Sequence, residues 1–108
     1  MSQFDKRQKA AEAKFALDEQ QLFKVTMRRN KLLGLWAAEK LGLSGDAVDA
    51  YAKAVIAADF DEPGHEDVFR KVFGDLTAKG LDISEHRIRR QMDDLMRAAA
   101  AEVEAEQG

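Results

Sequence analysis

Apolar residues recur every three to four positions along most of the chain, which is the period of an α-helix. Strands are not expected, because no stretch alternates apolar and polar residues with a period of two and β-branched residues are few. The pattern predicts helices at about 19–41, 46–60, 66–79 and from 85 onward. The residues that it places inward are Leu22, Val25, Leu32, Leu33 and Trp36 in the first helix; Val48, Tyr51, Ala52, Val55, Ile56 and Phe60 in the second; Val68, Phe69, Val72, Phe73 and Leu76 in the third; and Ile88, Met92, Leu95, Met96, Ala99 and Val103 in the fourth.

Glycine, proline and serine mark the breaks between these helices. A glycine-rich turn at 42–45 ends the first helix, Pro63 and Gly64 form a loop, Gly80 is a natural left-handed cap, and Ser84 is the expected N-cap of the last helix. Short loops and one apolar stripe per helix predict an all-α fold, an antiparallel four-helix bundle over residues 19–108 with a frayed C-terminal tail. Residues 1–18 have few large apolar side chains, so we expect a mobile N-terminal arm.

Composition narrows the class of protein further. The 108 residues suffice for one domain, and the absence of cysteine excludes a disulfide framework, a thiol nucleophile and a thiolate metal site. No apolar run reaches membrane-spanning length. The net charge of −3 argues against general nucleic-acid binding, but charge is unevenly placed: Lys24, Arg28, Arg29 and Lys31 form a basic block, whereas residues 46–67 and 102–106 are acidic. This asymmetry suits docking onto a charged protein surface, and solvated helix faces would give the same pattern.

The polar residues do not form a recognisable catalytic or metal site. His65 and His86 lack neighbours at metal-ligand spacing and are expected to be ordinary exposed side chains. The acidic residues around position 61 lack the ligand spacing of a calcium loop, and there is no glycine-rich phosphate loop. Asp93 and Asp94 are adjacent on a helix and point in different directions. We therefore expect no enzyme activity, no cofactor and no metal.

The N-terminal arm carries a sparse apolar face. Phe4, Ala11, Phe15 and Leu22 are spaced 7, 4 and 7 residues apart, which places them on one side of a helix, and charged residues occupy the rest. A segment that becomes helical in a partner's groove has this composition. A solubilising tail or a simple extension of the first helix would also fit the pattern.

Three segments carry a resemblance to a known family. They are the run from Arg28 to Glu39; Phe4-Asp5-Lys6-Arg7 with Glu12-Ala13-Lys14-Phe15-Ala16; and Ala58-Asp59-Phe60 with Glu66-Asp67-Val68. In these segments, and over nearly its whole length, the chain resembles the zeta inhibitor subunit of the F-type ATP synthase of alphaproteobacteria.

The resemblance implies a protein inhibitor of ATP hydrolysis. In that family the N-terminal arm enters an interface between the alpha and beta subunits of the catalytic head as a helix, next to the gamma subunit of the central stalk, and blocks rotation. It implies a cytoplasmic protein, peripheral to the inner membrane through the ATP synthase and without membrane insertion; we expect a monomer when it is free. The partner-binding residues expected from the resemblance and from the arm's apolar face are Phe4, Asp5, Arg7, Ala11, Glu12, Lys14 and Phe15, with Arg28, Arg29 and Lys31 as candidates for a second docking patch.

Other functions remain compatible with the pattern. A small helical adaptor or stress-related protein could use the same arm as a generic interaction tail. A nucleic-acid binder could use the basic block, although the acidic remainder of the chain argues against it. Weak nucleotide binding by the bundle is also left open, as is a helix surface at the basic block that contacts no partner.

Overall fold

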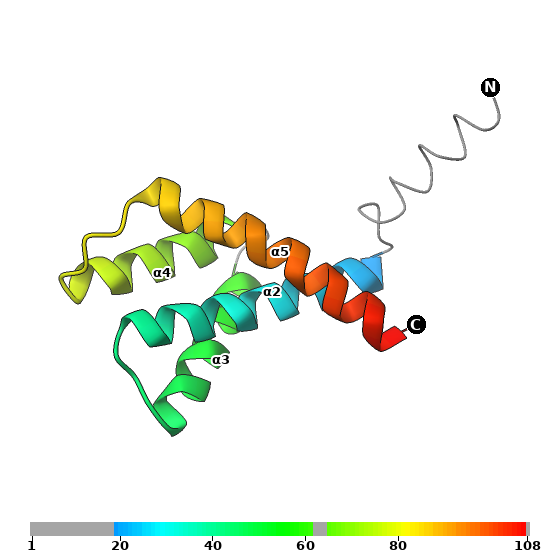
Figure 1. Cartoon of the computed structure of the whole chain (residues 1–108), viewed down its shortest axis with the longest axis horizontal. Coiled ribbons are helices and arrows are strands. Elements are labelled where there is room, and N and C mark those ends of the chain that lie inside the picture. Colours follow the sequence, from blue (N-terminus) through cyan, green and yellow to red (C-terminus); the bar gives the residue numbers. More distant parts are fainter. Residues whose placement is uncertain (1–18, 62–64, 108) are drawn as a thin grey trace.

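Four α-helices form an elongated bundle in the computed structural model, which describes residues 19–61 and 65–107 (Figure 1). They are α2 (Glu19–Lys40), α3 (Asp46–Asp61), α4 (Glu66–Ala78) and α5 (Glu85–Gln107). The all-α prediction is confirmed, and the first three helices end within a residue or two of where the sequence pattern predicted. None of the helices in this part of the chain is long and apolar enough to cross a membrane.

The main core lies where the inward stripes of all four helices meet. Its fully buried centre comprises Leu33, Val55, Val68, Val72, Leu76 and Ile88. A smaller cluster lies towards the other end of α2, where Val25 packs against Ala99 and Val103 of α5. The bundle therefore has a broad end stabilised by four helices and a narrower end stabilised mainly by α2 and α5, which run side by side in opposite directions (Figure 1).

Helix α2 is the central element, because α3, α4 and α5 all pack against it. It approaches α3 closely at Gly34, where a β-carbon built on the glycine would lie 2.6 Å from Cα of Ala52. This distance explains the glycine inside α2: only a residue without a side chain lets the two backbones come so near.

Local signals at the helix ends match their sequence predictions. The Oγ of Ser84 accepts a hydrogen bond from the backbone N–H of Arg87 at 3.1 Å, as an N-cap does. Gly80 has φ +88°, and the N–H of Leu81 donates to the carbonyl of Leu76, so α4 ends in a left-handed cap. We expected fraying near the C-terminus, but α5 is helical to Gln107.

Leu22 and several other side chains predicted to lie inward are less buried than expected. Leu22 is 45 % exposed, because it precedes by almost one turn the point where Val25 meets the end of α5. Trp36 is only partly buried and packs against the edge of the main core, with the Lys40 ammonium 5.7 Å from its ring centroid. The side chain of Phe60, also predicted inward, lies outside the part of the structure that is described.

Candidate functional site

The partner-binding residues expected in the arm lie outside the described residues. This holds for Phe4, Asp5, Arg7, Ala11, Glu12, Lys14 and Phe15. What the structure describes is the surface that follows the arm directly in the chain, formed by the first half of α2. The remaining candidates, Arg28, Arg29 and Lys31, lie there.

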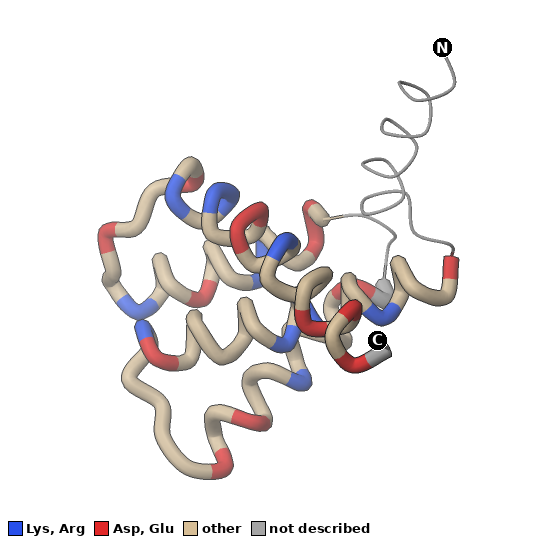
Figure 2. The backbone as a smooth tube through the Cα atoms, turned by 45° about the vertical axis from the view of Figure 1, so that its right-hand side comes forward, with Lys and Arg blue, Asp and Glu red and all other residues tan. Residues whose placement is uncertain are grey.

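Arg28 joins α2 to the last turns of α5. Its guanidinium donates to Glu102 at 2.8 Å and to Glu106 at 2.9 Å, and these hydrogen bonds raise the pKa of Arg28. Figure 2 shows acidic positions at the end of α5 beside basic positions of α2. Because both carboxylates are substantially exposed, the ion pairs contribute little to stability. Both carboxylates nevertheless bind the Arg28 guanidinium, the group that the sequence predicts as a contact for a partner protein.

Arg29 is buried, which corrects its prediction as a surface docking residue. It is 2 % exposed; its Nε donates to the side-chain oxygen of Asn30 at 2.7 Å, and its Nη2 lies 2.9 Å from Nδ1 of His65. A guanidinium has no acceptor, so Arg29 donates and the Nδ1 of His65 carries no proton. His65 is therefore more than the ordinary exposed histidine predicted from sequence, although it remains exposed to solvent.

No carboxylate lies within ion-pair distance of Arg29 among the described residues. Burial lowers the pKa of its guanidinium, and the more distant carboxylates of Asp59 and Asp93 partly oppose this effect. Asn30 is fully buried, and its Nδ2 has no hydrogen-bond partner in the described part of the chain. Arg29 and Asn30 thus form a small polar cluster inside the bundle. The contact between Arg29 and His65 links α2 to the residue that precedes α4.

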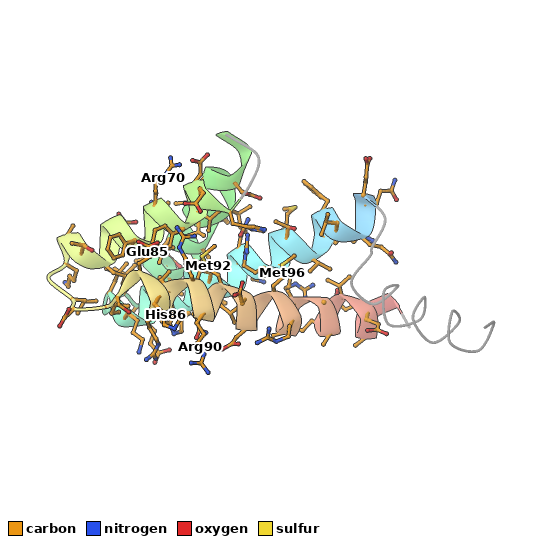
Figure 3. The ribbon with its side chains drawn as sticks, turned by 90° about the horizontal axis from the view of Figure 1, so that it is seen from above. Arg70, Glu85, His86, Arg90, Met92 and Met96 are labelled. Carbon is orange, nitrogen blue, oxygen red and sulfur yellow. The ribbon has the colours of Figure 1, made fainter. Side chains whose placement is uncertain are left out.

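A hollow of about 250 Å³ opens beside this polar cluster. Its walls come from α2, α4 and α5, with Met92 and Met96 as the apolar part. Figure 3 shows both methionines on the inner side of α5, whereas His86 and Arg90 point away from the bundle.

Arg89 forms part of the polar wall of this hollow, opposite the two methionines in character. Its guanidinium binds both carboxylate oxygens of Glu66, at 2.9 and 3.0 Å, and also Glu85 at 2.9 Å. The hydrogen bonds from Arg89 lower the pKa of Glu66. The same guanidinium lies 4.0 Å from the ring centroid of Phe69, so α4 and α5 are joined by an ion pair and a cation–π contact together.

A second hollow, of about 270 Å³, lies between α2, α3 and α5 on the side of Lys24 and Lys31. Met27, Ile56 and Val103 form its apolar lining, and both lysines are exposed at its border. We call it the α2/α3/α5 groove. Sequence reasoning found the lysines but missed the groove, because its lining comes from three helices that are distant in the chain.

The described residues do not bring three or more His, Asp or Glu side chains together as a metal site would. The geometry offers instead a charged and grooved protein surface beside the start of α2, next in the chain to the arm. Such a surface can dock a partner protein.

Comparison with known proteins gives the family. The family described as ATPase inhibitor subunit zeta matches residues 1–102. A solved structure described as a solution NMR structure is similar over 78 % of this chain and 95 % of its own, with 52 % sequence identity and a TM-score of 0.69. No curated protein matches the chain. The match over residues 1–102 includes both the arm and nearly all of the bundle, and the chain therefore belongs to the ATPase inhibitor subunit zeta family.

Proposed function

We propose that this protein inhibits ATP hydrolysis by the F-type ATP synthase. The observation that carries the proposal is the family match over residues 1–102, because it covers the arm as well as the bundle. The protein would be cytoplasmic and would reach the inner membrane only through the synthase.

In this proposal the arm, residues 1–18, is the inhibitory element. It inserts as a helix at an interface between the alpha and beta subunits of the catalytic head, beside the gamma subunit, and blocks rotation. Phe4, Ala11 and Phe15 form the apolar face, and Asp5, Arg7, Glu12 and Lys14 contact the walls. Burying one phenylalanine side chain contributes about 1.5–3 kcal/mol, so the two aromatic residues are the principal anchors.

The bundle would supply further contacts and keep the arm at high local concentration. Arg28 and Lys31 stay candidates for a docking patch; Lys31 is exposed, whereas Arg28 is partly buried and already pairs with Glu102 and Glu106. Arg29 is not part of this patch, because its guanidinium is turned into the bundle.

The test is a titration of the isolated catalytic head with the purified chain, with ATP hydrolysis as the readout. Phe15→Ala should weaken inhibition roughly ten- to over a hundredfold, with little change in the melting temperature. Ala13→Gln is the matched control, because position 13 is two residues away and lies on the opposite side of a helix.

Two results would contradict the proposal. If the wild-type chain leaves hydrolysis unchanged at saturating concentration, the inhibitor function is wrong. If a chain that starts at Glu19 and melts like the wild type still inhibits fully, the inhibitory element is the bundle and not the arm.

A further inference from the structure

The α2/α3/α5 groove combines an apolar lining with cations that have no acidic partner. Lys24, Arg28 and Lys31 are spaced by four and three residues and so share one face of α2. Arg28 is held by the end of α5, but Lys24 and Lys31 make no ion pair with any described residue. Two exposed ammonium groups therefore flank a hollow of about 270 Å³ that is lined by aliphatic and thioether side chains.

The contact between α5 and Arg28 shows which groups this face accepts. Glu102 and Glu106 are one helical turn apart, and both place a carboxylate on the same guanidinium. Glu106 also lines the groove. A helical segment with carboxylates one turn apart is thus already bound along one side of the cationic face, and the other side is open.

We propose that the groove binds an acidic amphipathic helix of the partner, which inserts one aliphatic side chain against Met27, Ile56 and Val103 and sets its carboxylates on Lys24 and Lys31. The proposal rests on the proposed function, because it assigns this helix to the catalytic head as a second contact beside the arm. The groove lies along the first half of α2, the helix that begins where the arm ends.

Charge argues against the chain's own arm as the occupant. Residues 1–18 carry Lys6, Arg7, Lys9 and Lys14 against Asp5, Glu12 and Asp18, an excess of one positive charge. A basic segment would meet the two free ammonium groups with repulsion. An acidic segment gains from both and also buries the apolar lining.

The first experiment tests the groove without the catalytic head. The probe is a blocked alanine-rich helical peptide with one leucine flanked by glutamates on the same face; the control peptide has lysines in place of the glutamates. Titration into the full chain should shift the methyl NMR signals of Met27, Ile56 and Val103, and only with the acidic peptide. The double variant Lys24→Gln/Lys31→Gln should lose this response. Absent shifts, shifts spread evenly over the bundle, or equal shifts with both peptides would overturn the proposal.

The second experiment uses the head and the inhibition assay. Lys24→Gln/Lys31→Gln should raise the concentration for half-maximal inhibition about three- to tenfold at low salt, with unchanged maximal inhibition and melting temperature. The matched control, Lys53→Gln/Lys79→Gln, removes two exposed lysines outside the groove and should have no effect. Glu106→Gln should act in the opposite direction, because it removes a competing carboxylate from the border of the groove.

The outcomes separate the two proposals. If the wild type does not inhibit, the proposed function fails, whereas the peptide titration still decides whether the groove takes an acidic helix. If the wild type inhibits and the lysine double variant inhibits equally well, the groove does not contact the head and the inference is wrong.

Two other occupants would also overturn the inference. Self-association in sedimentation that the lysine double variant abolishes would identify a second copy of the chain as the occupant. Groove methyl signals that shift on Phe4→Ala/Phe15→Ala in the free protein would identify the arm.

Discussion

Replacing Gly34 by alanine tests the closest approach in the bundle. The glycine is buried in α2, and an added β-carbon would lie 2.6 Å from the Cα and 3.1 Å from the Cβ of Ala52 in α3. Ordinary contacts between carbon atoms begin at about 3.5 Å. Because the nearest atom belongs to the backbone, a rotamer change cannot relieve the overlap. The two helices must separate by roughly 1 Å.

Two opposing contributions decide how far Gly34→Ala changes the free energy of unfolding. Alanine is favoured over glycine inside a helix by about 1 kcal/mol. Overpacking a well-packed interface costs about 1–3 kcal/mol, and here the upper half applies because backbone must move. The expected result is a net loss of about 1–2 kcal/mol in the free energy of unfolding. For a domain of this size that lowers the melting temperature by roughly 4–15 °C.

Gly74 is the matched control for this experiment. It lies inside α4 and is exposed, and a β-carbon added there would meet no atom within 4 Å, so Gly74→Ala gains helix propensity without a clash. We expect it to stabilise the bundle by about 0.5–1 kcal/mol. Chemical denaturation of both variants gives the comparison. If Gly34→Ala is as stable as Gly74→Ala, α2 and α3 do not meet as closely as described.

Three further predictions concern the buried arginine and the effect of pH. Arg29→Ala should destabilise the bundle by about 3 kcal/mol, since it leaves a cavity as well as two lost hydrogen bonds, whereas Arg29→Met fills most of that space and should cost less, as measured by denaturation. Because His65 accepts a hydrogen bond from Arg29, His65→Ala should lower the free energy of unfolding by about 1 kcal/mol, whereas His86→Ala, at an exposed position, should leave it unchanged. The hydrogen bonds from Arg89 lower the pKa of Glu66, so the ion pair stabilises the bundle at neutral pH, and this stabilisation is lost only as the pH falls below the ordinary carboxylate range of about 4. Glu66→Gln should therefore reduce the fall in melting temperature on the acid side of a pH profile. An unchanged profile would contradict the assignment.

Local signals were sufficient to predict the helices. Glycines with positive φ at 42, 45 and 80 and the cap at Ser84 lie where the sequence placed the breaks. The apolar stripes identified most of the core, because each stripe follows the period of its own helix. These features depend on residues that are near one another in the chain, so sequence alone can locate them.

The errors arose where neighbouring helices decide the outcome. The basic block predicts Arg29 as a surface cation, but Arg29 lies four residues after Val25 and four before Leu33, both buried, and this spacing places it on the inward face. Its partner His65 is 36 positions away, and no local pattern connects them. Leu22 lies on the helical stripe and is nevertheless exposed, because the packing of α5 against α2 decides how far the stripe is covered. The arm residues stay predictions.

The central position of α2 has a mechanical consequence. This helix follows the arm directly in the chain and contacts all three other helices. A pull on the first turn of α2 is therefore resisted by its interfaces with α3, α4 and α5 together. A pull on Gln107 acts instead on α5, which packs mainly against α2. Both α2 and α5 have one terminus at the narrow end of the bundle, but a load on α2 reaches three partner helices, whereas a load on α5 reaches mainly one.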